Sequence, residues 1–177
     1  YLSRILEGDL SRAITELRSR FKKLYLVGDE VYWGRLSRPR FGRPRLGNLE
    51  QRMRLYDAVT AYNMHTKDAR KLADCEKQLE SEYRDWSSVL STIGVDLIPS
   101  VIPGFDDTKV PNRDNPPLER RTERLERQVL TAMRYVSKCN MILITSFNEW
   151  HEDTQVEPAK EYGEEYLRVI HKCVTRP

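Results

Sequence analysis

Cysteine is scarce in this sequence, with three residues in 177, at Cys75, Cys139 and Cys173. No two of them form a CxxC pair, which excludes a disulfide framework and a zinc site built from cysteine pairs. Thiols this few and this far apart are typical of a reducing compartment, where they stay buried and unpaired. The cysteines therefore favour a cytoplasmic chain.

Long apolar runs are also absent. No stretch reaches the roughly 18 apolar residues that cross a bilayer, so we expect no membrane segment. The start, YLSRILEGDL, lacks the basic-then-apolar layout of a secretory signal, and the sequence holds no N-x-[ST] glycosylation site. It begins with Tyr1 rather than methionine, from which we expect a fragment or a processed chain.

An excess of charge of one sign is missing as well. Lysine and arginine number 30 and aspartate and glutamate 27, which gives a net charge of +3. This balance predicts a surface of mixed sign and argues against a nucleic-acid partner. No GxGxxG or GxxxxGK[ST] turn follows any apolar run, so a nucleotide site would lack its phosphate cradle. Nothing in the sequence indicates an oligomeric state.

What the sequence does contain is a regular alternation of two patterns. Apolar residues at steps of three to five predict helices over 3–22, 66–93, 118–138 and 160–174. Short continuous apolar runs predict strands over 24–28, 56–63, 95–104 and 140–147, and loops over 29–50 and 105–117. Strands that are apolar on both faces and alternate with helices predict an α/β fold with a parallel sheet.

Each predicted strand ends in a group of polar or aromatic side chains. The groups are Gly28-Asp29-Glu30, Tyr62-Asn63-Met64-His65, Phe105-Asp106-Asp107 and the stretch 148–152. In a (β/α)8 barrel such strand ends meet at one face and build the active site, and the complete barrel needs about 250 residues. We therefore expect residues 1–177 to form one partial domain, the C-terminal half of a (β/α)8 (TIM) barrel, whose missing strands precede Tyr1.

The densest polar group follows the fourth strand. Glu149 and Glu152 are three residues apart, so a helical turn would place their Cβ atoms about 5–6 Å apart. Two carboxyl groups at that range raise the pKa of one of them, which sets an acid beside a base, the pair that cleaves glycosidic bonds. Trp150 adds an aromatic face on which a sugar stacks. Hydrogen bonds to sugar hydroxyls are expected from Asn148, His151 and Gln155.

Two other interpretations of this group stay open. Asn148 is a suitable helix N-cap, and Glu149 and Glu152 would then favour the positive end of the helix. A metal site from Glu149, His151, Glu152 and Asp153 ranks below the carboxylate pair, because His151-Glu152 does not continue into HExxH.

Three blocks of this sequence resemble a known family. ITSFNEWHEDTQVEPA (144–159) is similar to the signature of glycoside hydrolase family 99, the endo-α-mannosidases, and of WbsX-like domains found beside polysaccharide glycosyltransferases. LIPSVIPGFDDTKV (97–110), with Asn112, Arg113 and Asn115 behind it, resembles a second block of that family. YDAVTAYN (56–63) resembles a strand that carries a site tyrosine, here Tyr62.

The resemblance implies a fold, a reaction and roles. It implies a (β/α)8 barrel and retaining cleavage of an α-mannoside without metal or organic cofactor. Glu149 would take the proton of the sugar 2-hydroxyl, whose oxygen attacks C1 to give a 1,2-anhydro sugar, while Glu152 protonates the leaving oxygen and then activates water. Tyr62 would lie near C1, and we expect Glu149 and Glu152 to face one open, sugar-sized hollow at the barrel rim. The partner implied is a glycan, and the Golgi lumen would replace the cytoplasm if the parent is eukaryotic.

A second reading of the same resemblance is a WbsX-like domain that binds or modifies cell-surface polysaccharide without hydrolysing it. Asp106 and Asp107 follow the third strand, where they hold sugar hydroxyls or stabilise the turn, and Arg113 pairs with an aspartate there. Trp33 is a further candidate for sugar stacking, and Glu157 is expected to be a helix-start charge.

The sequence departs from the family pattern at two places. The family's glycine after HE is Asp153, which adds charge and bulk where glycine allows an unusual backbone angle. The loop 32–47 matches nothing in the family pattern. Its arginines are solvated or meet an acidic polysaccharide or phosphate; they are Arg35, Arg38, Arg40, Arg43 and Arg45.

Overall fold

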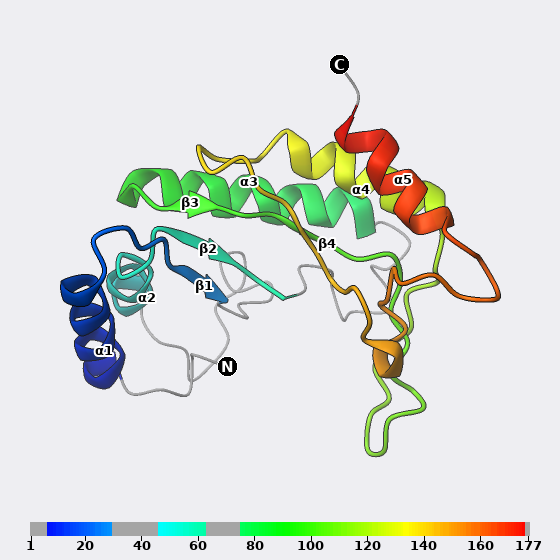
Figure 1. Cartoon of the computed structure of the whole chain (residues 1–177), viewed down its shortest axis with the longest axis horizontal. Helices are drawn as coiled ribbons and strands as arrows, with labels where there is room; N and C mark the ends of the chain where they lie inside the picture. Colours follow the sequence, from blue (N-terminus) through cyan, green and yellow to red (C-terminus); the bar gives the residue numbers. More distant parts are fainter. Residues whose placement is uncertain (1–6, 30–45, 63–74, 176–177) are drawn as a thin grey trace.

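The computed structural model describes residues 7–29, 46–62 and 75–175 (Figure 1). The helices are α1 (Glu7–Arg20), α2 (Leu46–Met53), α3 (Cys75–Ile93), α4 (Thr122–Met133) and α5 (Glu165–Val174), with a 3-10 turn η3 (Trp150–Glu152). The strands are β1 (Val27–Asp29), β2 (Ala58–Thr60), β3 (Asp96–Leu97), β4 (Ser100–Val101) and β5 (Leu143–Ile144).

All the strand pairs are parallel, as the sequence predicts. One sheet has the order β1-β2-β3 and a second the order β4-β5. Ala58 of β2 lies in register with Val27 on one side and Asp96 on the other, and Ser100 of β4 is opposite Leu143. Helices follow the strands along the chain and pack on them, so the predicted α/β class with a parallel sheet is confirmed.

The third predicted strand, 95–104, is two strands rather than one. β3 pairs with β2, whereas β4 pairs with β5, and Ile98-Pro99 separates them. Proline has no N–H to donate to a ladder, so it interrupts a strand that would otherwise continue. The Pro99 carbonyl still accepts from the Leu143 N–H at 2.9 Å, which lets the chain pass from one sheet to the next.

The loop predicted over 29–50 is wrong at its end, because α2 begins at Leu46. Leu46, Leu49 and Met53 recur with helical spacing, a short pattern that the neighbouring glycines and prolines obscure in the sequence. Met53 is fully buried and anchors the end of this helix in the core.

Two predicted helices are shorter than expected. The helix predicted over 118–138 is confined to Thr122–Met133, because Leu118 exchanges backbone hydrogen bonds with Phe105 instead. The helix predicted over 160–174 begins at Glu165. It follows a turn in which Ala159 and Gly163 exchange backbone hydrogen bonds, and Gly163 has a φ of 54°. In both places a β-bridge uses backbone groups that a longer helix would need.

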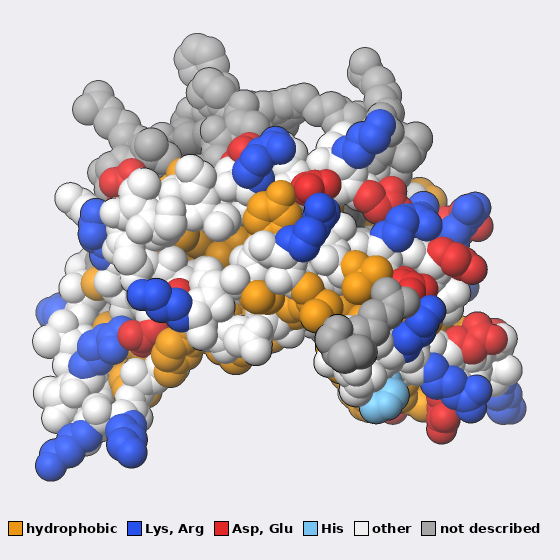
Figure 2. Space-filling view, turned by 90° about the horizontal axis from the view of Figure 1, so that it is seen from above, with side chains coloured by type: hydrophobic (Ala, Val, Ile, Leu, Met, Phe, Trp, Pro, Cys, Tyr) orange, Lys and Arg blue, Asp and Glu red, His pale blue; other side chains and the backbone are white. Residues whose placement is uncertain are grey.

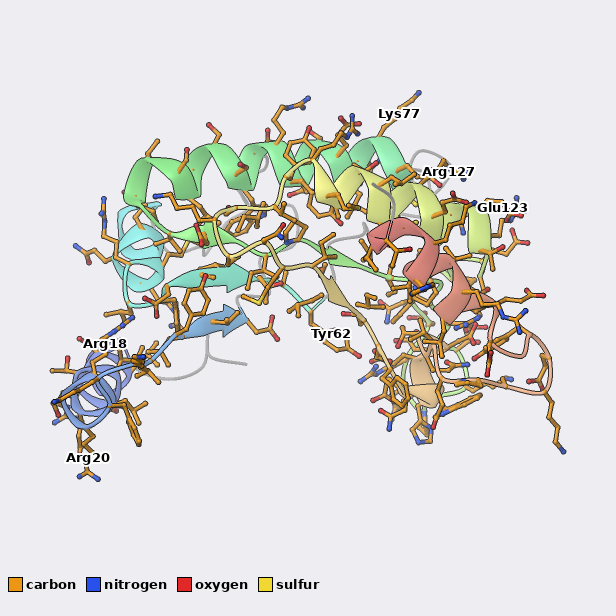
Figure 3. The ribbon with its side chains drawn as sticks, turned by 45° about the horizontal axis from the view of Figure 1, so that its top comes forward. Arg18, Arg20, Tyr62, Lys77, Glu123 and Arg127 are labelled. Carbon is orange, nitrogen blue, oxygen red and sulfur yellow. The ribbon has the colours of Figure 1, made fainter. Side chains whose placement is uncertain are left out.

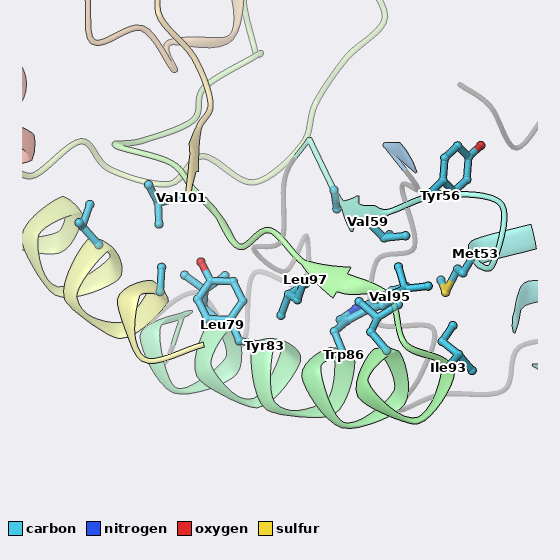
Figure 4. Packing of buried hydrophobic residues seen from close by; sticks show 14 of the residues in the cluster. Met53, Tyr56, Val59, Leu79, Tyr83, Trp86, Ile93, Val95, Leu97 and Val101 are labelled. Atoms are coloured by element: carbon cyan, nitrogen blue, oxygen red, sulfur yellow. The ribbon is translucent and has the colours of Figure 1, made fainter. Parts of the chain in front are cut away.

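The core lies between α3 and the strands (Figure 4). Leu79, Tyr83 and Trp86 repeat at three to four residues along α3, so they share one face and are buried against Leu97 and Val101. The Tyr83 hydroxyl donates to the Ser100 carbonyl at 2.6 Å, which satisfies the polar end of a fully buried ring. This packing fixes β4, and through it the loops that carry the candidate site.

The surface carries charges of both signs, as the composition predicts. Figure 2 shows Lys and Arg interspersed with Asp and Glu around a band of hydrophobic side chains. Cys75 and Cys173 are buried, whereas Cys139 is partly exposed and so departs from the expected burial. Among the described residues, no helix combines the length and hydropathy that a bilayer crossing requires.

Candidate active site

The ends of β2 and β5 come together at one point of the molecule. The Thr145 hydroxyl, just after β5, donates to the Tyr62 carbonyl just after β2, and the Tyr62 N–H donates to Asp29 Oδ1 at 2.9 Å. Residues 83 positions apart in the sequence are thereby held side by side (Figure 3). The structure thus brings together three of the predicted strand ends on one face, as expected for parallel strands.

The segment after β5 folds back on itself to form a closed loop. Ser146 N–H donates to the Thr154 carbonyl at 2.8 Å, and Val156 N–H returns to the Ser146 carbonyl at 3.0 Å. The Ser146 hydroxyl accepts from the Glu149 N–H at 2.8 Å. These bonds fix the backbone that presents η3, so its side chains are held without a long helix beneath them.

Glu149 and Glu152 lie at the two ends of the 3-10 turn η3 and do not share a regular α-helical turn. Glu149 precedes η3 with a non-helical ψ of 80°, and Glu152 is its last residue. Glu152 Oε2 accepts from the Tyr62 hydroxyl at 3.3 Å, and Oε1 lies 2.5 Å from Arg113 Nη1. Asn148 is exposed and is not an N-cap through its side chain.

The Tyr62 phenol is influenced by both carboxylates. Burial raises its pKa to about 12, and the negative charges of Glu152 and Glu149, with the hydrogen bond to Glu152, act in the same direction. A phenol with so high a pKa stays protonated at neutral pH and serves as a hydrogen-bond donor. Tyr62 and the two glutamates therefore form one electrostatically connected group.

Arg113 is held between two carboxylates. Its Nη1 is 2.5 Å from Glu152 Oε1 and 3.5 Å from Oδ2 of Asp107, which is buried and also accepts from Asn115 Nδ2 at 2.6 Å. The predicted pairing of Arg113 with an aspartate is confirmed, but its shorter contact with Glu152 is not evident from the sequence. No periodicity or motif brings position 113 beside 152, because the contact depends on how two loops fold.

A hollow of about 770 Å³ opens beside η3. Four of the residues expected to bind substrate line it: Asp106, Trp150, His151 and Gln155. Glu149, Glu152, Tyr62 and Asn148 are not among its lining residues. Of the predicted site residues, four therefore line this hollow, whereas Tyr62 and Glu152 contact each other outside its lining.

Three of the predicted substrate-binding residues that line the hollow already make hydrogen bonds within the protein. Asp106 Oδ1 accepts from the N–H and the hydroxyl of Thr108, and these bonds lower the pKa of Asp106. Gln155 is buried and its Nε2 lies 3.4 Å from Asp153 Oδ1. The indole N–H of Trp150 donates to Glu157 Oε2 at 2.8 Å, so Glu157, expected to be a helix-start charge, orients a ring of the site.

Asp153 and Arg120 both line the hollow. Asp153 has φ 51° and ψ 36°, the left-handed region in which the family's glycine carries no penalty. Arg120 donates to the carbonyls of Asp153 and Gln155, both at 2.7 Å. Burial raises the pKa of Asp153 against the opposing charge of Arg120. Sequence reasoning missed Arg120, because it lies 33 residues from its partner.

Several residues named from the sequence fall outside the described parts of the chain. They are Glu30, Trp33, Asn63, Met64, His65 and the arginines at 35, 38, 40, 43 and 45. Within residues 7–29, 46–62 and 75–175, no three histidine, cysteine, aspartate or glutamate side chains gather as a metal-binding group.

Comparison with known proteins identifies the family of this chain. A family model described as glycosyl hydrolase family 99 matches residues 76–169, more than half of the chain. The chain belongs to glycosyl hydrolase family 99. The match runs from the start of α3 to the middle of α5 and so includes Arg113, Glu149 and Glu152 of this family 99 chain.

The sequence is also similar to mammalian proteins. Mouse glycoprotein endo-alpha-1,2-mannosidase-like protein and rat glycoprotein endo-alpha-1,2-mannosidase are each 33% identical over 82 residues, which is 45% of this chain. The matched segment spans only 18% of either of those proteins.

Solved structures show the same fold. A protein described as glycoside hydrolase-like superposes with a TM-score of 0.76 at 20% identity. The superposition covers 97% of this chain and 50% of the other protein. The endo-alpha-mannosidase of Bacteroides thetaiotaomicron gives 0.57 at 19% identity, over 86% and 43%. The predicted fold, part of a (β/α)8 barrel, is confirmed, and this chain spans about half the length of the barrels it matches.

Proposed function

We propose that this chain contributes the catalytic carboxylates of a retaining endo-α-mannosidase-like enzyme. Glu149 removes the proton from the 2-hydroxyl of the substrate sugar, and that oxygen attacks C1 to form a 1,2-anhydro sugar. Glu152 protonates the departing oxygen and afterwards removes a proton from the water that opens the anhydro ring. The substrate class is a glycan with α-linked mannose, by analogy with the named relatives.

The observation that carries this proposal is the position of Tyr62 against both glutamates. Its hydroxyl lies 3.3 Å from Glu152, and the charge of Glu149 also acts on it. A glycosidase needs two carboxyl groups beside one sugar ring, and the influence of both glutamates on Tyr62 supports such a pair. Arg113 pairs with one oxygen of Glu152, and the Tyr62 hydroxyl donates to the other.

We further propose that residues 1–177 form one partial domain, completed by strands that precede Tyr1. Supporting this, 97% of the chain superposes on half of a longer glycoside hydrolase-like chain. Sequencing the reading frame upstream of the Tyr1 codon tests it. About four further βα units are expected there, and a frame that opens at Tyr1 would contradict the proposal.

The test of the catalytic pair is the replacement of each glutamate by glutamine in the protein that carries this chain. Hydrolysis of an α-1,2-mannose oligosaccharide should fall by at least about 100-fold in Glu149→Gln and in Glu152→Gln, since each removes a general acid or base. Glu123→Gln, on the outer surface of α4 (Figure 3), is the matched control and should keep the wild-type rate. Wild-type rates for both site variants would refute the assignment.

The hollow favours one alternative function. Aromatic and polar side chains are among its lining residues, but Glu149 and Glu152 are not. A WbsX-like domain that holds polysaccharide without cleaving it would need such a surface and no catalytic pair. Sugar affinity without hydrolysis in the protein that carries this chain would favour this alternative.

A further inference from the structure

The residues of η3 and its flanks divide between two surroundings. Glu149 and Glu152 act on Tyr62, whereas Trp150, His151 and Asp153 line the hollow of about 770 Å³. A volume of this size lies within the roughly 300–1,000 Å³ typical of ligand sites. The hollow is therefore large enough to hold a ligand of its own, apart from the group around Tyr62.

Two aromatic rings of this hollow are anchored to the same residue. The indole N–H of Trp150 donates to the Glu157 carboxylate at 2.8 Å, and the Tyr162 hydroxyl donates to the Glu157 carbonyl at 3.0 Å. The Arg120 guanidinium lies 4.8 Å from the centre of the Tyr162 ring and holds it from one side. Rings fixed in advance lose little side-chain entropy when a ligand stacks on them.

The Trp150 ring is nevertheless open to a ligand. It exposes 47% of its surface, although its polar end is already bonded. A half-exposed aromatic face beside hydrogen-bonding groups suits a ligand with C–H groups on one side and hydroxyls on its edges. Sugar rings have that form.

The charges of the hollow favour a neutral ligand. Asp106, Asp153 and Glu161 oppose two cations, Lys109 and Arg120. Arg120 is already committed to two backbone carbonyls, so a phosphate, sulfate or carboxylate would meet more negative than free positive charge. Carboxylates that are partly exposed accept hydrogen bonds from sugar hydroxyls.

We propose that this hollow is a second carbohydrate subsite, which binds a neutral sugar residue of the glycan across η3 from the catalytic pair. Trp150 and Tyr162 supply the stacking surface, and Asp106, His151 and Asp153 bond the hydroxyls. The inference rests on the proposed function only in taking the ligand as part of the same glycan. It makes Asp153, where the family pattern has glycine, a specificity-determining residue of the subsite.

The test is a titration of the isotopically labelled protein that carries this chain with α-1,2-mannobiose, followed by the NMR signal of the Trp150 indole N–H. We expect saturable shifts with a Kd on the order of 1 mM, as for a single small sugar site. Trp150→Ala, followed by titration calorimetry because it lacks the indole signal, and Asp153→Gly should each weaken binding about fivefold to tenfold, which is on the order of one hydrogen-bond or stacking contact. His151→Ala, at an exposed position that leaves the core intact, is the second variant and should weaken it about threefold.

Glu123→Gln is the matched control, because Glu123 is exposed on α4 and does not line the hollow, and it should keep the affinity of the unaltered protein. A disaccharide with a uronic acid in place of one mannose should bind several-fold more weakly than α-1,2-mannobiose. No saturable shift at Trp150, or affinity lost in Glu123→Gln and kept in the hollow variants, would overturn the subsite. Either outcome leaves the hydrolysis test of Glu149 and Glu152 standing, so the two proposals fail separately.

Discussion

Asp153 shows how one residue combines a backbone role with a side-chain role. Its φ of 51° lies where an L residue is strained, and its Oδ1 is 3.5 Å from Arg120 Nη1. The ion pair is partly exposed, so its stabilising contribution is small. The backbone position explains the glycine of the family pattern, and the side chain explains what this sequence adds.

Replacing Asp153 by glycine and by alanine separates these two roles. Both variants lose the carboxylate, but only glycine relieves the left-handed strain, so Asp153→Gly should be more stable than Asp153→Ala by about 1 kcal/mol. Urea denaturation of the two variants measures the difference. Equal stabilities would show that the backbone at 153 relaxes away from the left-handed region.

Tyr62 gives a pH-dependent prediction at the same scale. Its pKa in the folded chain is about 12 against an ordinary 10.0, because burial and Glu152 disfavour the phenolate. The unfolded chain therefore releases this proton first, and the contribution of Tyr62 to stability, complete below pH 10.0, falls as the pH rises towards about 12.

Glu152→Gln should lower the pKa of Tyr62, because it removes a negative charge and weakens the hydrogen bond to the phenol. NMR titration of tyrosine labelled at the phenolic carbon, with Tyr62→Phe to assign the signal, measures it. Glu157→Gln, which alters a carboxylate bonded to Trp150, should leave the titration unchanged. A Tyr62 that titrates near pH 10 in the unaltered chain would contradict the contact.

At the scale of elements, Arg120 links three segments that precede or follow helices. Located before α4, it bonds the carbonyls of Asp153 and Gln155 in the loop after β5. Its guanidinium also lies 4.8 Å from the ring centre of Tyr162 and 4.4 Å from that of Tyr166, at the start of α5. Gly104 makes room for it, because a Cβ there would lie 2.3 Å from Arg120 Cγ.

Arg120→Met should therefore destabilise the chain by roughly 2–4 kcal/mol, since two partly buried carbonyls lose a charged donor and two rings lose a cation. Arg121→Met is the control: its side chain is exposed and bonds to Glu119, so the change should stay within about 0.5 kcal/mol. Denaturation midpoints decide the comparison. Similar losses of stability in both variants would contradict the stabilising role of the contacts made by the Arg120 guanidinium.

The elements differ in how well the sequence predicts them, for physical reasons. The stripe of α3 is explicit in the spacing of Leu79, Tyr83 and Trp86, because a helix buries one face at a fixed period. The division of 95–104 at Pro99 depends on which neighbour each half pairs with, which no local pattern encodes. Short α2 offers too few turns for its period to stand out beside glycine and proline.

The candidate site shows the same division. Glu149, Trp150 and Glu152 form a dense local cluster, which sequence reasoning finds because all its members are contiguous. Arg113 and Arg120 reach that cluster only through the folding of loops 30 to 40 residues away. Contacts between distant loops depend on the whole chain, so they lie beyond what spacing alone predicts.

At the scale of the whole molecule, the strands form an open array. In the part of the chain that the structure describes, β5 pairs with β4 on one side and with no strand on the other, and β1 likewise pairs only with β2. Leu143 of β5 and Val27 of β1 expose 42% and 40% of their surface. Exposed apolar side chains on unpaired strand edges favour association with another chain.

The isolated 177-residue chain should therefore self-associate as its concentration rises. Leu143→Lys should suppress this, because a charge on the free edge of β5 cannot be buried against a second strand. Phe21→Lys is the matched control: Phe21 follows α1, is 54% exposed and lies on no strand edge, so its replacement should change association little. Sedimentation velocity over a range of concentrations measures both. The prediction is wrong if the chain stays monomeric at all concentrations, or if the two lysine variants reduce association equally. Either result would mean that the chain does not associate through its unpaired strand edges.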